Sequence, residues 1–350
     1  MKIFFDDSTV KESLWPLTAT RNAADIRVGI LTIREKWERL IALCYLNSNR
    51  LPDEAVIIVN ASIIPSCQTI FSINADGNIA IENTDDSCKV IHYPWDIFQV
   101  NDWALRKDVE LISTAAGAVN RIHELSASNT LIAPENIFIE AGASVTCSII
   151  NASTGPVYIA KNATVMEGCM IRGPFALCEG ATLKMGAKIY GATTIGPYCI
   201  AAGEIKNAIL FGYSNKAHDG YLGDSVIGEW CNFGAGTTNS NIKNTAGELR
   251  MWNNATKELT PVGTKGGLIM GDYSRTAINT SFNTGTVVGV CCNVFNQGFP
   301  PKLINSFTWG EERYVFEKAI QDIDNWKKLK GKTITEEEKI ILNNLYNQNI

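Results

Sequence analysis

Aliphatic residues recur at every sixth position through the middle of the chain. Neither an α-helix nor a flat strand repeats every six residues, so the pattern indicates another architecture. Small residues crowd the positions between, as in Glu179-Gly180-Ala181. This combination is typical of a hexapeptide-repeat parallel β-helix, in which each hexad forms one short side of a triangular coil and its aliphatic residue points inward. The repeating positions are Ile159, Val165, Ile171, Leu177, Leu183, Ile189 and Ile195.

The six-residue period is interrupted and then returns. A polar stretch, residues 245–264, breaks it and predicts a hairpin that leaves the coil. The period resumes at Met270, Thr276, Phe282, Val288 and Val294, so one continuous β-helix with an excursion is expected. It is also irregular from Cys199 to Asp219. There the polar segment Ser214–Asp224 predicts a loop held on a rigid scaffold, a favourable place for function.

The two ends of the chain have different patterns. Phe4–Asp7 and Ala55–Asn60 predict short strands and Thr32–Leu43 predicts a helix between them, which suggests an open α/β domain. A helix over Leu105–Ala118 is expected to lead to the coils. Helices over Glu311–Leu329 and Thr335–Asn347 are expected to seal the open end of the β-helix. The predicted division is a reduced α/β domain (1–102), a helical linker (103–128), the β-helix (129–299, insertion 245–264) and a C-terminal helical cap (300–350).

Composition and charge narrow the possible partners. A formal net charge of −5 over 350 residues argues against nucleic acid. No apolar run reaches membrane-spanning length, and the first residues do not resemble a signal peptide, so we expect a cytoplasmic protein without a membrane partner. The ten cysteines show no metal-ligand spacing. Free thiols in a reducing compartment explain them, and we assign no metal.

Three histidines are available for proton transfer. His92 and His123 lie in segments where a structural role is expected. His218 differs because it lies in the polar segment that interrupts the repeat. A neutral imidazole titrates near physiological pH and suits removal of a proton from an attacking amine, so His218 is the candidate catalytic base.

The run KAHDGYLGDSVIGEWCNFGAGTTNSN, Lys216–Asn241, resembles the acetyltransferase half of the bifunctional N-acetylglucosamine-1-phosphate uridylyltransferase/glucosamine-1-phosphate acetyltransferase. With Leu17–Trp37 and the INSFTWG run ending at Gly310, the whole chain resembles shortened bacterial sugar-nucleotidyltransferase-like relatives of that enzyme. The resemblance implies a left-handed β-helix and a homotrimer with acyl-transfer sites between neighbouring subunits. It also implies acetyl-CoA or another acyl-CoA as co-substrate.

The resemblance assigns roles to individual positions. The catalytic base falls on His218, and the backbone amide that faces the thioester oxygen falls on Ala235. The residues on the amine side are Asn232 and Asn241. The residues implied for phosphate binding are Lys184, Lys206, Tyr221 and Lys265. Lys184 stands where the family has an arginine, which keeps the charge and loses the bidentate fork.

The N-terminal region departs from a working uridylyltransferase. Such an enzyme opens with a glycine-rich loop that cradles nucleotide phosphates, whereas this chain has Leu17-Thr-Ala-Thr-Arg21. Arg21 and Arg27 are the candidates for nucleotide binding, with Mg²⁺ required only if this domain is active. A domain retained for assembly is the other interpretation.

Three functional hypotheses follow. The first is an acyl-CoA-dependent N-acyltransferase acting on an amino sugar phosphate or a nucleotide-linked amino sugar. The second is a sugar-1-phosphate nucleotidyltransferase that uses UTP or dTTP, with the β-helix serving oligomerisation. The third is a non-catalytic scaffold that kept the fold. The fold by itself does not decide among them, because one fold can host many functions.

Overall fold

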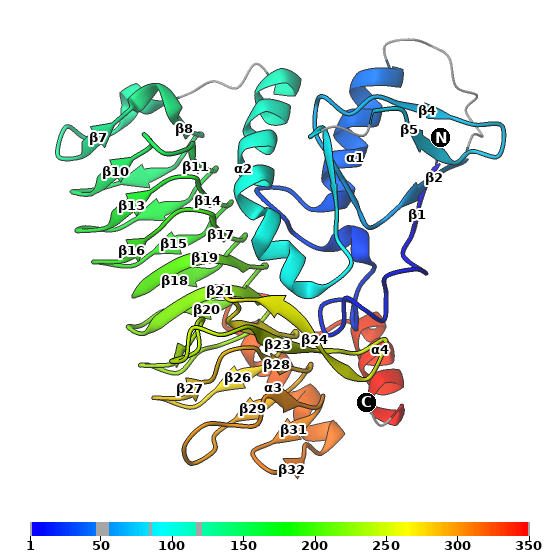
Figure 1. Ribbon diagram of the computed structural model, residues 1–350. Coiled ribbons are helices and arrows are strands. Elements are labelled where there is room, and N and C mark those ends of the chain that lie inside the picture. The colour runs from blue at the N-terminus through cyan, green and yellow to red at the C-terminus, as the bar shows by residue number, and fades with distance from the viewer. Residues whose placement is uncertain (1, 47–55, 84–85, 117–120, 349–350) are drawn as a thin grey trace.

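A column of stacked parallel coils forms the larger part of the molecule, with the N-terminal region packed along one side (Figure 1). The computed structural model describes residues 2–46, 56–83, 86–116 and 121–348. Each coil runs through a first, a second and a third face, and the strands of each face pair in parallel from coil to coil along most of the column. The six-residue period therefore does encode a parallel β-helix.

The strands are grouped by face. The first face contains β7 (Thr130–Ile132), β10 (Ile149–Asn151), β13 (Met170–Arg172), β16 (Lys188–Ile189), the first parts of β19 (Glu204–Leu210) and β21 (Tyr221–Ile227), β22 (Thr238–Asn239) and β27 (Ser281–Phe282). The second contains β8 (Ile137–Ile139), β11 (Val157–Ile159), β14 (Phe175–Leu177), β17 (Thr193–Ile195), the second parts of β19 and β21, β25 (Leu268–Met270), β28 (Thr286–Val288) and β30 (Leu303–Ile304). The third contains β9 (Ser144–Val145), β12 (Thr164–Val165), β15 (Thr182–Leu183), β18 (Ile200–Ala201), β20 (Asn215–Lys216), β26 (Arg275–Thr276), β29 (Asn293–Val294) and β31 (Thr308–Trp309).

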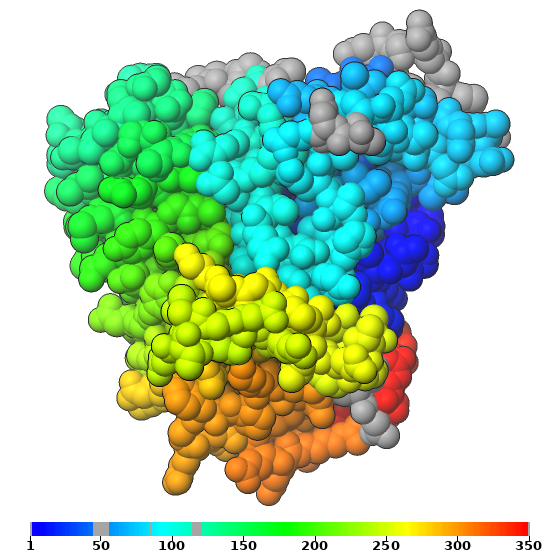
Figure 2. All heavy atoms as spheres, in the orientation of Figure 1, coloured from blue at the N-terminus to red at the C-terminus, as the bar shows by residue number. Residues whose placement is uncertain are grey.

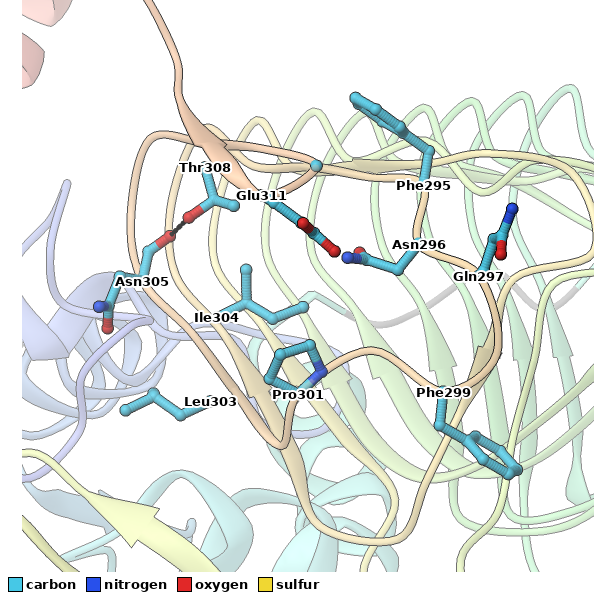
Figure 3. Close-up of a pocket in the computed structure, with 11 residues that line it drawn as sticks. Phe295, Asn296, Gln297, Phe299, Pro301, Leu303, Ile304, Asn305, Thr308 and Glu311 are labelled. Atoms are coloured by element: carbon cyan, nitrogen blue, oxygen red, sulfur yellow. Dashed lines mark hydrogen bonds between the residues drawn. The ribbon is translucent and has the colours of Figure 1, made fainter.

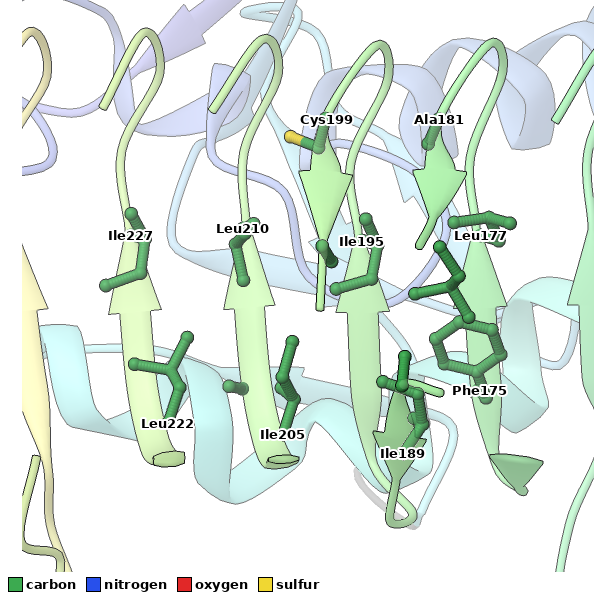
Figure 4. Close-up of a cluster of buried hydrophobic side chains, with 14 of the residues drawn as sticks. Phe175, Leu177, Ala181, Ile189, Ile195, Cys199, Ile205, Leu210, Leu222 and Ile227 are labelled. Carbon is green, nitrogen blue, oxygen red and sulfur yellow. The ribbon is translucent and has the colours of Figure 1, made fainter. Parts of the chain in front are cut away.

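The repeating aliphatic residues fill the interior of the coils. Figure 4 shows Leu177, Ile189 and Ile195 among the side chains that stack there. None of the seven residues from Ile159 to Ile195 that define the period is more than 3% exposed. Full burial of an aliphatic side chain is worth roughly 1.5–3 kcal/mol, so this stack is the main source of β-helix stability.

The irregular stretch after Cys199 is a shortened coil. Leu183 pairs with Ala201, eighteen residues later (201 − 183), whereas Ala201 pairs with Lys216, fifteen residues later (216 − 201). The coil therefore continues with three residues fewer, which shifts the phase. The expected loop at Ser214–Asp224 is instead β20 and β21, joined by a turn at residues 217–220.

The N-terminal region has the expected strand–helix–strand unit. β1 (Lys2–Asp6) pairs in parallel with β2 (Val56–Asn60). Between them, α1 (Ile33–Ile41) begins at a capping box formed by Thr32 and Glu35, which satisfies backbone donors at the helix start. Two antiparallel pairs complete this region: β3 (Ile63–Pro65) with β6 (Cys88–Val90), and β4 (Phe71–Ile73) with β5 (Ile79–Ile81).

A long helix, α2 (Pro94–Ala116), lies between the N-terminal region and the coils (Figure 1). It begins at Pro94, ahead of the predicted start at Leu105, and the predicted end at Ala118 lies outside the described residues. Asn101 links three segments, since its Oδ1 accepts from the Gly29 amide at 2.8 Å and its Nδ2 donates to the Ala192 carbonyl at 2.7 Å. The helix is therefore an interface element that packs against both neighbours.

The segment 245–264 is the predicted hairpin. Its strands β23 (Leu249–Asn253) and β24 (Glu258–Gly263) are antiparallel and lie across the base of the N-terminal region (Figure 2). Leu249 and Met251 are fully buried in the core shared by the N-terminal region and the second face. The hairpin therefore stabilises the interface between the N-terminal region and the β-helix.

The C-terminal segment differs from the expected cap. β30, β31 and the antiparallel β32 (Glu312–Arg313) extend the coils past residue 299. The helices α3 (Phe316–Lys328) and α4 (Glu336–Asn347) follow. α4 matches its predicted range, whereas α3 begins five residues after the predicted start at Glu311 (316 − 311), because Glu312 and Arg313 form β32. They pack along the side of the last coils, against Trp230 and Tyr273, rather than across the open end. None of the helices in the described part of the chain has the length and apolar character needed to cross a membrane.

Candidate functional site

His218 lies on the turn between β20 and β21, at the corner where the third face meets the first. Its side chain is exposed. The corner of the next coil contains Ala235, and the two corners are joined by a hydrogen bond from the Gly236 amide to the Asp219 carbonyl at 3.2 Å. The Ala235 amide has no acceptor among the described residues, although its carbonyl accepts from the Asn279 amide at 2.7 Å. A free amide therefore lies one coil away from the imidazole.

A hydrogen-bonded polar cluster lies where the first face turns into the second. Asp224 is its centre, with one carboxylate oxygen accepting from Asn207 Nδ2 at 2.6 Å and the other from Asn241 Nδ2. The same Asn241 nitrogen donates to the Tyr221 hydroxyl at 3.1 Å. The Asp224 side chain is almost fully buried. This network fixes the orientations of Tyr221 and Asn241.

The tyrosine hydroxyl stays protonated at neutral pH. Burial, with smaller contributions from the carboxylates of Asp224 and Glu204, raises the pKa of Tyr221 to about 12. Its oxygen already accepts from Asn241, so its own proton is available to a ligand. Tyr221 is therefore a neutral hydrogen-bond donor, as phosphate recognition requires.

Two exposed lysines flank this cluster. Lys206 pairs in register with Gly223, and the Tyr221 hydroxyl lies over that glycine, since a Cβ there would come within 2.2 Å of it. Lys265 precedes Gly266, whose amide donates to the Asn241 carbonyl at 2.9 Å. Neither lysine forms an ion pair within the described residues. Four of the predicted residues, Lys206, Tyr221, Asn241 and Lys265, are thus brought together.

Two other predicted residues lie apart from this group. Asn232 is on the third face, between Asn215 and Arg275 in neighbouring coils. Lys184 begins the same corner as His218 but belongs to a coil two steps earlier, roughly 10 Å away at the usual strand spacing. Within one chain, Asn232 and the Tyr221 cluster therefore lie on different faces.

The N-terminal arginines are both engaged. The Arg21 guanidinium pairs with Asp272 and lies 3.4 Å from Glu229, and its side chain is only 12% exposed. Arg27 donates to the Ile30 carbonyl and lies 3.8 Å from Glu35. Among the residues that the structure describes, no group of three His, Cys, Asp or Glu side chains is arranged to hold a metal ion.

Sequence reasoning missed the two polar residues that organise the cluster, Asn207 and Asp224. Both occupy corners with left-handed backbone, at φ of 48° and 47°. Asparagine and aspartate tolerate this conformation better than most other residues with side chains. Their positions just after an outward-facing residue of the first face, Lys206 and Gly223, are the signal that could have identified them.

A cavity of about 900 Å³ lies at the far end of the coils (Figure 3). Phe295, Asn296, Phe299, Leu303 and Ile304 are among the residues that line it. The corner that contains His218 and Ala235 leads toward it, because Asn279 contacts Ala235 and the next coil at this corner contains Asn296. Ile278 at this corner is 69% exposed. An elongated ligand could therefore follow one edge of the β-helix.

Comparisons with known proteins found a matching family model and several sequence relatives. The family model for sugar nucleotidyl transferases matches residues 2–83. A bifunctional sugar-1-phosphate nucleotidylyltransferase/acetyltransferase from Sulfurisphaera tokodaii is 26% identical over 82% of this chain and 68% of its own length. The chain is related to these bifunctional transferases. A bifunctional protein GlmU from Methanocaldococcus jannaschii is 30% identical over 42% of the chain and 34% of its own length.

A third bifunctional relative, the GlmU protein of Methanococcus maripaludis, is 29% identical over 57% of the chain and 41% of its own length. The chain therefore spans between 34% and 68% of these three relatives. An Arabidopsis UDP-N-acetylglucosamine acyltransferase structure aligns over 57% of this chain and 76% of that chain, with 12% identity and a TM-score of 0.29, too low to support an argument. The three sequence relatives are all described as bifunctional proteins, and the first of them as a transferase with two activities.

Proposed function

We propose that the chain is an acyl-CoA-dependent N-acyltransferase that acts on an amino sugar phosphate or a nucleotide-linked amino sugar. One observation carries the proposal: the exposed His218 turn stacks against the free Ala235 amide, while Lys206, Lys265 and Tyr221 gather on the adjoining face. The first pair suits acyl transfer, and the second group suits a phosphate.

In the proposed reaction, the neutral amine of the sugar attacks the thioester carbonyl carbon. A C–N bond forms, the C–S bond breaks, and the thiolate leaves and is protonated to the CoA thiol. His218 removes the proton that the amine loses, which a positioned imidazole does efficiently near neutral pH. The Ala235 amide donates to the oxyanion that develops on the thioester oxygen, where a preorganised donor has its largest effect.

The substrate phosphate is proposed to bind at the first face. It carries close to two negative charges at neutral pH. Lys206 and Lys265 would offset that charge, and the Tyr221 proton would donate to one phosphate oxygen. Lys184 would join them only from a coil two steps earlier at the His218 corner.

Two further parts of the proposal concern the acyl-CoA and a second subunit. The corner from Ala235 through Ile278 to the cavity at Asn296 is proposed to accommodate the elongated CoA chain. Asn232 lies on another face from Tyr221, so a site that uses both requires a neighbouring copy of the chain. We therefore propose a homotrimer with sites between subunits.

Thiol release from acetyl-CoA in the presence of glucosamine 1-phosphate and related amino sugars tests the proposal. His218→Ala should lower kcat by about 1,000-fold, within the range that general base catalysis contributes. His92→Ala is the matched control, because His92 is also exposed and lies in the N-terminal region. The proposal is wrong if wild-type protein is inactive on all the amino sugars tested, or if His218→Ala is as active as wild type.

A sugar-1-phosphate nucleotidyltransferase is the second candidate. The family match over residues 2–83 favours it, since that match covers the region that would bind nucleotide. The ion pairs of Arg21 with Asp272 and Glu229 weigh against it, because an engaged guanidinium is not free for phosphate. Pyrophosphate release from UTP or dTTP with a sugar 1-phosphate, lost in Arg21→Ala, would establish this activity.

A further inference from the structure

Lys216 stands at an inward-facing position of the repeat, where the three preceding coils have an apolar residue. It pairs with Ala201, which pairs with Leu183, which in turn pairs with Val165, and these three side chains point into the coils. Lys216 is only 2% exposed. Its side chain therefore enters the β-helix interior, one of the least favourable places for a charge.

The amine of Lys216 is bound by backbone carbonyls. Its Nζ donates to the carbonyl of His218, to that of Asp219 at 3.2 Å and to that of Ala202 at 3.3 Å. Among the described residues, the carbonyls of His218 and Ala202 have no other donor, and no carboxylate forms an ion pair with Lys216. Three N–H groups thus meet three carbonyls, two of them on the turn that contains His218.

We propose that Lys216 is a positioning residue that fixes the backbone of the His218 turn and so aims the imidazole at the substrate amine. The inference rests on the proposed acyl transfer and deepens it. Gly220 ends the turn at a φ of 122°, and Gly203 lies beneath it at a φ of 77°. Such glycine-flanked backbone has few constraints of its own, because glycine adopts many conformations. The hydrogen bonds from Lys216, made from inside the coil, restrict the conformation of this turn.

The number of donors depends on the protonation of this amine. Burial lowers the pKa of Lys216 to about 8, partly offset by the charge of Asp219 on the same turn. The flanking coils contain further titratable groups, among them Glu204, Lys206, Glu229 and the thiols of Cys199 and Cys231. The two thiols stay neutral because burial raises their pKa. Above pH 8 the amine has two N–H groups for three carbonyls, so the turn loses a hydrogen bond.

Steady-state kinetics of three variants test the proposal. Lys216→Met should lower kcat by about 100-fold with KM for the sugar phosphate within about twofold, because a misplaced catalytic group affects the chemical step. Lys216→Gln keeps a donor without titrating, so it should lack the decline in kcat above pH 8 that we expect of wild type. Val165→Met, at the same inward column, is the control and should keep wild-type kcat. A wild-type kcat in Lys216→Met, or a loss confined to KM, would overturn the proposal.

A second readout does not depend on turnover. With ¹³C-labelled histidine, NMR needs to follow the signals of only three histidines. Lys216→Met should shift the His218 signal and leave those of His92 and His123 in place. The wild-type His218 signal should also show an inflection near pH 8 that the variant lacks. If wild type is inactive as an acyltransferase, the proposed function fails while this measurement still decides the role of Lys216; an unmoved His218 signal refutes that role.

Discussion

The N-terminal region and the polar coils of the β-helix use their basic side chains in opposite ways. Arg21 is almost fully buried, paired with Asp272 and placed 5.3 Å from the centre of the Phe211 ring. Lys206 and Lys265 are exposed, and no ion pair engages them within the described residues. A cation that is already paired and desolvated contributes to assembly, whereas an exposed cation beside an oriented hydroxyl is available to a ligand. The contacts of Arg21 therefore hold the N-terminal region against the coils, whereas the exposed lysines remain available for the proposed phosphate binding.

The largest effect is expected from breaking the Arg21 pair. Asp272→Ala should lower the free energy of unfolding by about 3–5 kcal/mol, because it leaves a buried guanidinium with only the more distant Glu229. Urea denaturation measures this loss. Asp25→Ala is the control, since its pair with Arg34 is partly exposed and should be worth at most about 1 kcal/mol. An equally small loss in Asp272→Ala would mean that Arg21 is free for nucleotide.

Lys206→Ala, in contrast to Asp272→Ala, should lower activity and leave stability almost unchanged. We expect kcat/KM for the amino sugar phosphate to fall by about 10- to 100-fold, as for the loss of a hydrogen bond to a charged group. Stability should change by less than about 0.5 kcal/mol, because the side chain is exposed. Lys161→Ala removes an equally exposed lysine from a distant corner and should leave both quantities unchanged. A comparable loss of activity in both variants would contradict phosphate binding by Lys206.

A third measurement follows the pH dependence of stability that the buried Lys216 should cause. The pKa of Lys216 is lowered to about 8 from its usual 10.5, so between these values the unfolded chain binds more protons than the folded one. Stability contributed by this group therefore rises with pH. Relative to Lys216→Met, wild type should gain about 2 kcal/mol between pH 7 and pH 10. A pH-independent difference between the two proteins would show that Lys216 titrates normally.

The smallest expected effect is that of Tyr221→Phe. Removing the hydroxyl should raise KM by about 10-fold, equivalent to about 1.5 kcal/mol, the low end for a hydrogen bond to a charged group. Asn241 keeps Asp224 as its acceptor, so the thermal midpoint should stay close to that of wild type. Steady-state kinetics and circular dichroism check the two expectations. A fall in kcat with unchanged KM would place Tyr221 in the chemical step instead.

Much of the fold was accessible from local pattern. The residues from Ile159 to Ile195 repeat because each coil presents one inward position per face, and the strand–helix–strand unit follows from short-range periodicity. The helix at Pro94 was underestimated, since its first turns are buried against two partners and lack an amphipathic pattern. The last helix was located correctly by its cap at Thr335, whereas the start of α3 was predicted too early, at Glu311. The place of both helices beside the coils depends on Trp230 and Tyr273, which are distant in sequence.

For the candidate site, too, some features follow from the sequence and others only from the tertiary structure. The sequence by itself determined the β-helix, the hairpin and the residue types that could serve acyl transfer, because repeat and motif are local properties of the chain. Only the tertiary structure decided that Asp224 orients Tyr221 and Asn241, that Asp272 engages Arg21, and that Lys216 points inward to the His218 turn. These contacts join different coils or different halves of the molecule, and their geometry depends on how the shortened coil stacks, which no local pattern records.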